Sequence, residues 1–357
     1  MVDCHFFGLD PRWHHASSLF LHVCNAVALY LILTRFTGAR LESAIAAALF
    51  AVHPVNTEAV AWIAARKDPL CTFLALLATA CYGAYAARPG RLRYLAVLTV
   101  YCLALMAKPM AIALPAAFLL LDYWPLGRWR ASGERGPSAV RLIIEKVPLF
   151  VAALACVLIA AITQSIAGAL GSAQDYPLGI RIANAAVSYV AYLRNVLWPA
   201  GLAVYYPHPG SGLAWWKAVA AGTALVGATG AAWALRRRCP YLFTGWFWYL
   251  VMLFPVSGAA VQLGSHAMAD RYGYLPLIGV FVAAAWALVA LAARWGRPRA
   301  VLVPAAVLVA ACVAGANLQV RHWRNSEALF THALAVTPAN PVAHNNLGEF
   351  YLEQHDW

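Results

Sequence analysis

The chain has 357 residues, of which 63% are hydrophobic and only 11% are charged. Soluble domains carry about 25% charged residues, so most of this chain is expected to lie in lipid rather than in water. The formal net charge of +12 does not indicate nucleic-acid binding, because the basic residues are scattered in short groups between apolar stretches.

Apolar stretches follow one another along most of the chain. A membrane-spanning helix needs roughly 20 mostly apolar residues, or somewhat fewer in a packed bundle. Ten stretches meet this condition, although the second is short: 15–33, 41–53, 69–87, 92–107, 109–124, 147–163, 213–235, 241–259, 274–293 and 300–318. Residues 182–199 are also apolar, but Arg181 and Arg194 flank and interrupt them, so an interfacial or re-entrant helix is expected there.

Lysine and arginine gather in alternate loops, with dense groups at 88–93, 128–146 and 236–238. The positive-inside rule makes these loops cytoplasmic. Residues 1–14, 164–212 and everything beyond about 319 are then expected outside the cytoplasm. The brief loops favour a bacterial inner membrane with the C-terminal segment in the periplasm, and an ER membrane is the alternative.

The last 38 residues change in character and are predicted to form a second unit. Residues 320–357 are polar and amphipathic, unlike the membrane unit at 1–319. Tetratricopeptide (TPR) units repeat every 34 residues, with small, aromatic and proline residues at fixed positions. Five positions agree with one such register: Phe330, Ala333, Leu347, Gly348 and Tyr351, counted from Pro338. The start of an extracytoplasmic TPR array is therefore expected, continuing beyond Trp357 and holding an acceptor or partner protein. A simple helical hairpin is the alternative.

Ionisable residues at membrane depth are costly and mark candidate functional sites. The first group begins with His53 and Glu58 and ends at Arg66-Lys67-Asp68-Pro69. Asp68 and Pro69 suit the start of a helix, as N-cap and first helical residue. Arg66 and Lys67 would then lie beside a helix N-terminus, where an anion such as a phosphate is favoured. Contact with lipid headgroups is an equally good interpretation of these two residues.

Two further groups are predicted on the same side of the membrane. Lys108 lies alone between two apolar stretches and is either a second phosphate contact or an interfacial lysine. Asp270-Arg271-Tyr272 follows His266, and Asp270 either caps the next helix and pairs with Arg271 or leaves Arg271 to bind phosphate. His208 adds an imidazole to this face. No metal-ligand spacing occurs among the cysteines and histidines, so no metal is expected.

Several segments, in this order, resemble one family: the transmembrane-and-TPR protein O-mannosyltransferases and their bacterial homologues. They are Phe7–Pro11, His53–Asp68, Lys108–Pro109, Leu121–Leu126, Tyr206–Pro209 and Ala269–Tyr272. The resemblance implies an all-α polytopic membrane bundle of the GT-C glycosyltransferase type, followed by a TPR solenoid. It also implies transfer of a sugar, typically mannose, from a polyprenyl-phosphate donor to a Ser or Thr hydroxyl outside the cytoplasm.

The same resemblance implies that a first helix and an acidic loop carrying the catalytic aspartate precede Met1. Neither Asp3 nor Asp10 matches that motif, so the chain alone is expected to be inactive and its general base is unknown. The expected donor-phosphate ligands are Arg66, Lys67, Lys108, Arg271, His208 and His266. Glu58 is a supporting candidate for orienting the sugar, and His53, Asp68, Asp270 and Tyr272 are expected to be structural or orienting.

The departing phosphate would be held by these cations, so no cofactor is required beyond the polyprenyl-phosphate sugar itself. Two other functions stay open. A non-catalytic scaffold would use the bundle as an anchor and the TPR groove to hold a partner. A transporter of lipid-linked sugars would need inverted repeats and charges near mid-membrane, which the sequence does not show.

Overall fold

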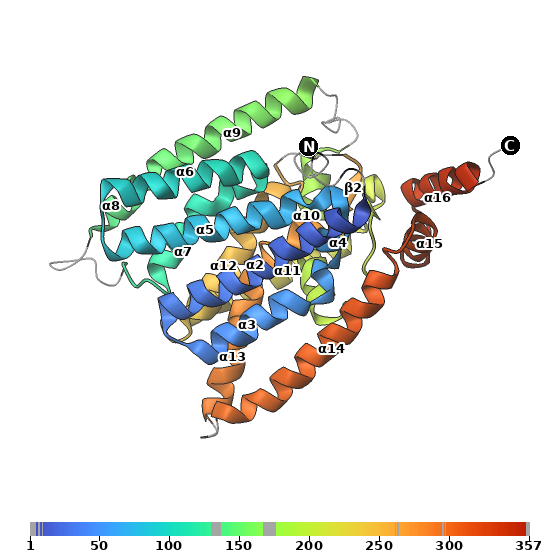
Figure 1. The fold of residues 1–357 in the computed structure, drawn as a ribbon. Coiled ribbons are helices and arrows are strands. Elements are labelled where there is room, and N and C mark those ends of the chain that lie inside the picture. The colour runs from blue at the N-terminus through green and yellow to red at the C-terminus, as the bar shows by residue number, and fades with distance from the viewer. Residues whose placement is uncertain are drawn as a thin grey trace.

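The computed structural model is an almost wholly helical bundle (Figure 1). It describes residues 10–129, 137–166, 176–260, 264–294 and 298–354, together with residues 5, 8, 262 and 296. The expectations for Asp3, Phe7, Leu9 and the loop at 130–136 lie outside these residues.

The chain runs through its α-helices in the following order: α2 (Pro11–Thr37), α3 (Arg40–Val52), α4 (Thr57–Ala61), α5 (Lys67–Ala87), α6 (Arg91–Ala107), α7 (Leu114–Tyr123), α8 (Ala139–Ile144), α9 (Val147–Ile166), α10 (Leu178–Leu197), α11 (Trp215–Leu235), α12 (Pro240–Leu253), α13 (Leu277–Arg294), α14 (Leu302–Arg321), α15 (Ser326–Val336) and α16 (Pro341–Gln354).

Short 3-10 helices connect many of these: η1 (Pro54–Asn56), η2 (Ile63–Ala65), η3 (Pro109–Ala113), η4 (Gly210–Gly212), η5 (Phe254–Val256), η6 (Asp270–Gly273) and η7 (Pro298–Val301). The two short strands β1 (Tyr206–Pro207) and β2 (His266–Met268) pair antiparallel, with Tyr206 opposite Met268 and Pro207 opposite His266.

Six helices in the described part are long and apolar enough to cross a membrane. They are Pro11–Thr37, Ile63–Ala87, Ala139–Ile166, Trp215–Leu235, Leu277–Arg294 and Leu302–Arg321. A seventh span is formed if Arg40–Val52 and Pro54–Ala61 are counted together across their 52° bend. The chain is therefore an integral membrane protein of the polytopic, all-α class.

The prediction of ten independent spans was too high. Pro109–Tyr123 and Pro240–Val256 are apolar but short, and α6 has 17 residues. Prolines account for the shortening, since they lack the N–H that continues a helix and are accepted at its first turn. Pro109 opens η3 and Pro255 lies inside η5. The segment at 182–199 is a regular helix, α10, with Asn184, Ser188 and Asn195 on its buried face.

The two ends of the bundle differ in chemistry. One end carries the turns between α2 and α3, α5 and α6, and α11 and α12; it is called the arginine end because these turns hold Arg35, Arg40, Arg88–Arg93 and Arg236–Arg238. The other, called the outer end, carries η1, α4, both strands and η6. The N-terminal part of α2 and the helices α15 and α16 lie toward the outer end in Figure 1.

Buried polar side chains fasten the helices to one another within the bundle. His22 contacts the Tyr274 hydroxyl at 2.6 Å and the Ala51 carbonyl oxygen at 2.8 Å. Asn25 donates to the Pro69 carbonyl oxygen at 2.9 Å and to the Tyr274 hydroxyl at 3.2 Å. These bonds connect α2 to α3, α5 and the segment before α13.

A network of buried charged side chains lies at the arginine end, and no pattern in the sequence predicted it. Arg128 donates to Asp122 at 3.0 Å and to Glu145 at 2.6 and 3.1 Å, and Lys146 pairs with both carboxylates. The Tyr82 hydroxyl donates to Asp122 at 2.7 Å. Asp122 and Lys146 are fully buried, so each charge depends on the others to offset its loss of water.

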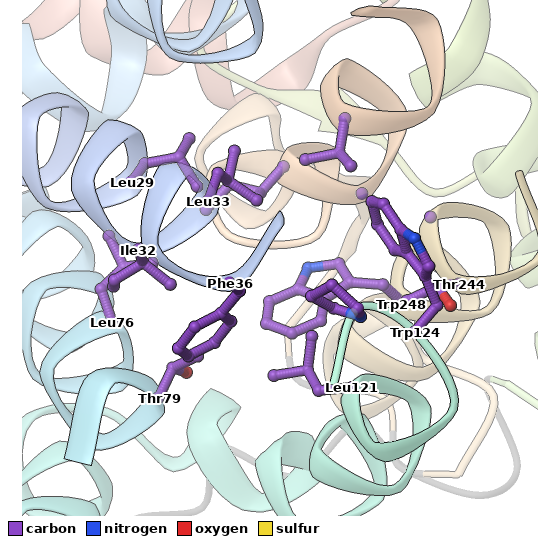
Figure 2. Close-up of a pocket in the computed structure, with 15 residues that line it drawn as sticks. Leu29, Ile32, Leu33, Phe36, Leu76, Thr79, Leu121, Trp124, Thr244 and Trp248 are labelled. Atoms are coloured by element: carbon purple, nitrogen blue, oxygen red, sulfur yellow. The ribbon is translucent and has the colours of Figure 1, made fainter. Parts of the chain in front are cut away.

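Figure 2 shows an apolar cavity between α2, α5, α7, α12 and α13. Leu29, Ile32, Leu33 and Phe36 of α2 face Leu121 of α7, Trp124 just after α7 and Trp248 of α12 across it. The cavity holds about 50 Å³ and its lining exposes no polar surface. Such a space stays dry or takes hydrocarbon, because the Thr244 hydroxyl is the only buried side-chain polar group without a partner among its described lining residues, and a buried water needs about two to four partners.

The helices α15 and α16 pack on each other through Ala333 and Ala343, both fully buried. Asn325 and Asn340 cap them, each accepting a backbone N–H three residues on, at 2.9 and 3.0 Å. Asn340 also donates to the Tyr205 carbonyl oxygen at 3.1 Å. His332 contacts the Leu202 carbonyl oxygen at 3.0 Å. The pair is thus tied to the loop that carries β1, while its assignment to a TPR array stays a prediction.

The contact between α12 and α13 gives a test of the packing. A Cβ atom added at Gly279 would lie 2.3 Å from the Gly245 carbonyl oxygen, so Gly279→Val must push the two helices apart. We expect a loss of about 1–3 kcal/mol in the free energy of unfolding, as for other overpacked sites. The measurement is thermal unfolding of the detergent-solubilised chain. Gly227→Val on α11 is the control, because nothing lies within 4 Å of its added Cβ, and an equal loss in both variants would contradict the close contact.

Candidate functional site

A cluster of charged and aromatic side chains lies at the outer end, where η1 and α4 meet η6 and where β1 pairs with β2. Glu58 of α4 is the first anchor of this cluster. Its Oε2 accepts the main-chain N–H of Arg271 at 2.9 Å, and its Oε1 pairs with the Arg271 guanidinium. The guanidinium carbon lies 4.6 Å from the centre of the Trp62 ring. Arg271 is therefore fixed by its backbone, its charge and a cation–π contact together.

Asp68 and Lys108 form a second ion pair beside the first. Lys108 is in extended backbone between α6 and η3, and its Nζ pairs with Asp68 Oδ1. The other carboxylate oxygen of Asp68, Oδ2, is buried and accepts no hydrogen bond from any described residue.

The expectation that Asp68 is the N-cap of the helix starting at Pro69 was wrong. The 3-10 turn η2 runs into α5, which begins at Lys67, and its N-cap position, Arg66, makes no side-chain cap bond. The Asp68 side chain is consequently free of the backbone and available to Lys108.

Tyr272 is the point where the two cations converge. Lys108 Nζ lies 4.7 Å and the Arg271 guanidinium carbon 5.0 Å from the centre of its ring. The Tyr272 hydroxyl lies 3.2 Å from His266 Nε2. Tyr272 and His266 also line a small hollow of about 30 Å³, together with Gln262 and residues 255–258. Lys108 and Arg271 thus both contact the Tyr272 ring, and Tyr272 forms part of the wall of this hollow at the outer end.

Asp270 binds neither of the partners that one interpretation of the sequence offered it, the next helix N-terminus and Arg271. Its oxygens accept from Asn195 Nδ2 at 3.0 Å and from the Tyr206 hydroxyl at 2.7 Å. It opens η6 without capping it, and Arg271 pairs with Glu58 instead. Burial, reinforced by the nearby Glu58 carboxylate, raises the pKa of Asp270 to about 8 despite these hydrogen bonds and Arg271.

The histidines of the site supply hydrogen bonds rather than charge at neutral pH. Burial, with Arg271 and His208 adding repulsion, lowers the pKa of His266 to about 4. Burial also lowers the pKa of His208, whose Nδ1 accepts the Gly210 N–H at 2.9 Å. His53 engages both ring nitrogens, with the Val196 carbonyl oxygen at 3.0 Å and the Val55 N–H at 3.3 Å, so it orients the turn after α3.

Arg66 and Lys67 are placed differently from the other expected phosphate ligands. Arg66 reaches the start of α2, where it donates to Ser17 Oγ at 3.0 Å. Lys67 is exposed and forms no ion pair with any residue that the structure describes. The structure therefore gathers Glu58, Asp68, Lys108, Arg271, Tyr272 and His266, and leaves these two basic residues at its edge.

Three members of the cluster were assigned no role from the sequence: Trp62 and Tyr206, which lie in segments that carry the resemblance, and Asn195, which does not. They come from separate loops and helices and carry no periodic pattern, so only the tertiary structure brings them to Arg271 and Asp270. The site contains two carboxylates and two cations in direct pairs, with aromatic rings around them. Within the described ranges, no three His, Cys, Asp or Glu side chains are placed to hold a metal ion.

Comparison with known proteins gives a partial likeness. No family model and no solved structure matches the chain. Protein O-mannosyl-transferase TMTC1 of Homo sapiens is 40% identical over 76 residues, and its Mus musculus counterpart is 41% identical over 76 residues. The match covers 21% of this chain and 9% and 8% of those proteins. The chain thus resembles a part of a protein O-mannosyl-transferase. Both relatives are animal proteins, so a bacterial inner membrane stays a prediction.

The raised pKa of Asp270 predicts how stability depends on pH. The folded form holds a proton up to pH about 8, whereas the unfolded chain loses it near 4. Folding stability from this group is therefore complete below pH 4 and is lost as pH rises through 8, by at most about 1.4 kcal/mol per pH unit. Burial lowers the pKa values of His208 and His266, so these two side chains act in the opposite sense: the unfolded chain loses their protons near pH 6.5, and folding gains stability as pH rises through that value. Their contribution is common to the wild type and to a variant that changes Asp270 alone, so the comparison of the two isolates Asp270.

Asp270→Asn keeps one of the two oxygens that accept from Asn195 and Tyr206, replaces the other by an amide donor, and cannot ionise. We expect a rise in pH from 6.5 to 8 to lower the unfolding temperature of the wild-type chain relative to that of the variant, because only the wild type carries the Asp270 contribution. Thermal unfolding in detergent at both pH values is the measurement. A variant that retains the full wild-type difference would show that Asp270 is not the titrating group.

Proposed function

We propose that this chain is the membrane unit of a glycosyltransferase that moves a sugar, mannose in our assignment, from a polyprenyl-phosphate donor to a protein Ser or Thr hydroxyl. The reaction would take place at the outer end of the bundle. The convergence of Lys108 and Arg271 on Tyr272, beside an opening at that end, is the observation on which this rests. The partial likeness to protein O-mannosyl-transferase TMTC1 supports the choice of sugar and acceptor.

The reaction needs charge stabilisation on the leaving group. A bond forms between the acceptor oxygen and the anomeric carbon while the bond from that carbon to the phosphate oxygen breaks. The phosphate leaves with the electron pair, and the hydroxyl proton passes to a base. Fixed cations beside the departing phosphate lower the barrier, because they need no reorganisation as charge builds. Arg271 and Lys108 take this part, with Arg66 and Lys67 at the rim of the site.

The remaining side chains hold these cations in place. Glu58 and Asp68 fix the positions of Arg271 and Lys108 and lie close enough to accept hydrogen bonds from sugar hydroxyls. His266 and His208, as neutral imidazoles, would donate hydrogen bonds to phosphate oxygens. His53, Asp270 and Tyr272 would hold the loops around the site in position. Glu58 and Asp68 are both bound to cations, and no described residue is assigned as the general base.

The proposed arrangement in the membrane follows from the charge distribution. The arginine end faces the cytoplasm and the outer end faces the periplasm or an ER lumen. The helices α15 and α16 would begin a TPR array on that outer side, where they could present an acceptor protein to the site. A bundle of the GT-C type is the architecture that we infer for the complete enzyme.

A second function, that of a non-catalytic scaffold, is favoured by one observation. Lys108 and Arg271 are each already paired with a carboxylate, so the site carries no net charge when all four groups are ionised. Buried pairs of this kind also serve simply to join helices. In a scaffold the bundle would be an anchor, and the helices α15 and α16 would hold the partner protein.

The two functions are separated by binding of a polyprenyl-phosphate mannose to the purified chain, followed by mannose transfer in membranes carrying the full protein. For the enzyme, we expect Arg271→Gln and Lys108→Gln each to weaken donor binding about tenfold, and to lower transfer by about a hundredfold or more. Lys217→Gln, which removes an exposed cation at the outer end of α11, should change neither quantity.

Folding of each variant is checked by its thermal unfolding temperature, because loss of one partner of a buried pair destabilises the chain. A folded Arg271→Gln variant with unchanged donor binding would contradict the proposed glycosyltransferase function and would favour the scaffold function. Transfer by residues 1–357 alone would contradict the expectation that the general base lies outside this chain.

A further inference from the structure

A second cavity lies at the arginine end, on the far side of the bundle from the candidate site. It is a groove of about 590 Å³ between the last two turns of α2 and the last two turns of α5. Its α2 wall is formed by Leu31, Ile32, Arg35 and Phe36, and the α5 wall by small residues including Ala80, Gly83 and Ala84. A groove of this size falls in the range of small-ligand sites.

The surroundings of the groove identify the class of ligand. Both α2 and α5 belong to candidate membrane spans, so the medium beside the groove is lipid. Ala84 and Leu31 are exposed, which leaves the apolar walls open to that medium. Three groove residues, Ile32, Phe36 and Pro125, also line the apolar cavity of Figure 2, so hydrocarbon space continues behind the groove.

The mouth of the groove carries one uncompensated positive charge. Arg35 is exposed and makes no hydrogen bond or ion pair with any residue in the described ranges. Arg128 also lines the groove, but its guanidinium is held by Asp122 and Glu145 and its charge is cancelled. Arg35 is thus the cation that an incoming anion would meet.

We propose that this groove binds an anionic phospholipid of the adjoining leaflet, with one acyl chain between α2 and α5 and the headgroup phosphate on Arg35. The apolar walls match an acyl chain, and the free guanidinium matches a phosphate oxygen pair. The site is separate from the outer end and does not depend on the glycosyltransferase function.

Gly83 explains why the groove keeps its shape. A Cβ atom at this position would lie 2.2 Å from the Phe36 ring, so the ring rests directly on the α5 backbone. Phe36 is thereby held against α5 and out of the space that the acyl chain takes. A bulky side chain at Ala84, one residue on and exposed, would fill that space without touching the buried core.

The test is native mass spectrometry of the detergent-solubilised chain, delipidated and then titrated with phosphatidylglycerol, phosphatidylcholine or inorganic phosphate. We expect one phosphatidylglycerol to be retained at least fivefold more strongly than phosphatidylcholine, with no effect of inorganic phosphate. Arg35→Gln should lower phosphatidylglycerol affinity about fivefold, the usual effect of one basic residue near a lipid headgroup. Ala84→Phe should abolish binding of both lipids.

Arg91→Gln is the matched control, because Arg91 is exposed at the start of α6 on the same end and does not line the groove. It should bind phosphatidylglycerol as the wild type does. Equal retention of the two lipids, equal effects of Arg35→Gln and Arg91→Gln, or wild-type binding by a folded Ala84→Phe variant would each overturn the assignment. Thermal unfolding of every variant shows that it is folded.

Discussion

The structure depends on pairing each buried cation with a carboxylate. An ionised side chain in hydrocarbon loses its hydration, and only a close opposite charge with well-placed hydrogen bonds offsets that cost. Lys108 and Arg271 meet Asp68 and Glu58 at the outer end, and Arg128 and Lys146 meet Asp122 and Glu145 at the arginine end. Removing one partner of such a pair typically costs about 3–5 kcal/mol.

These pairs also determine which parts of the chain come together. Glu58 and Arg271 are 213 residues apart in sequence, yet both the backbone and the side chain of Arg271 bind the same carboxylate. Asp68 and Lys108 join the start of α5 to the turn after α6 in the same way. Apolar packing alone gives little specificity between helices in lipid, so polar contacts of this kind select the neighbours.

The sequence predicted much of the helical content and little of the site geometry. Apolar runs and charge-rich turns located the helices, because hydrophobicity is a local property of the chain. Which carboxylate pairs with which cation is not local: adjacency in sequence suggested Asp270 as one possible partner of Arg271 and Asp68 as a helix cap, and neither contact forms. Asn195 could not be found at all, since it carries no charge, and Tyr206 stood in a recognised segment without an assigned role, because the links of both residues to Asp270 exist only after folding.

The loop at 201–206 joins two parts of the molecule mechanically. Its carbonyl oxygens at Leu202 and Tyr205 hold His332 of α15 and Asn340 before α16, and its Tyr206 hydroxyl holds Asp270. A force applied to α15 and α16 is therefore transmitted through the backbone of residues 202–206 to Asp270. A protein that docks on α15 and α16 would exert force on residues 201–206, and the same segment holds the side chain that donates a hydrogen bond to Asp270.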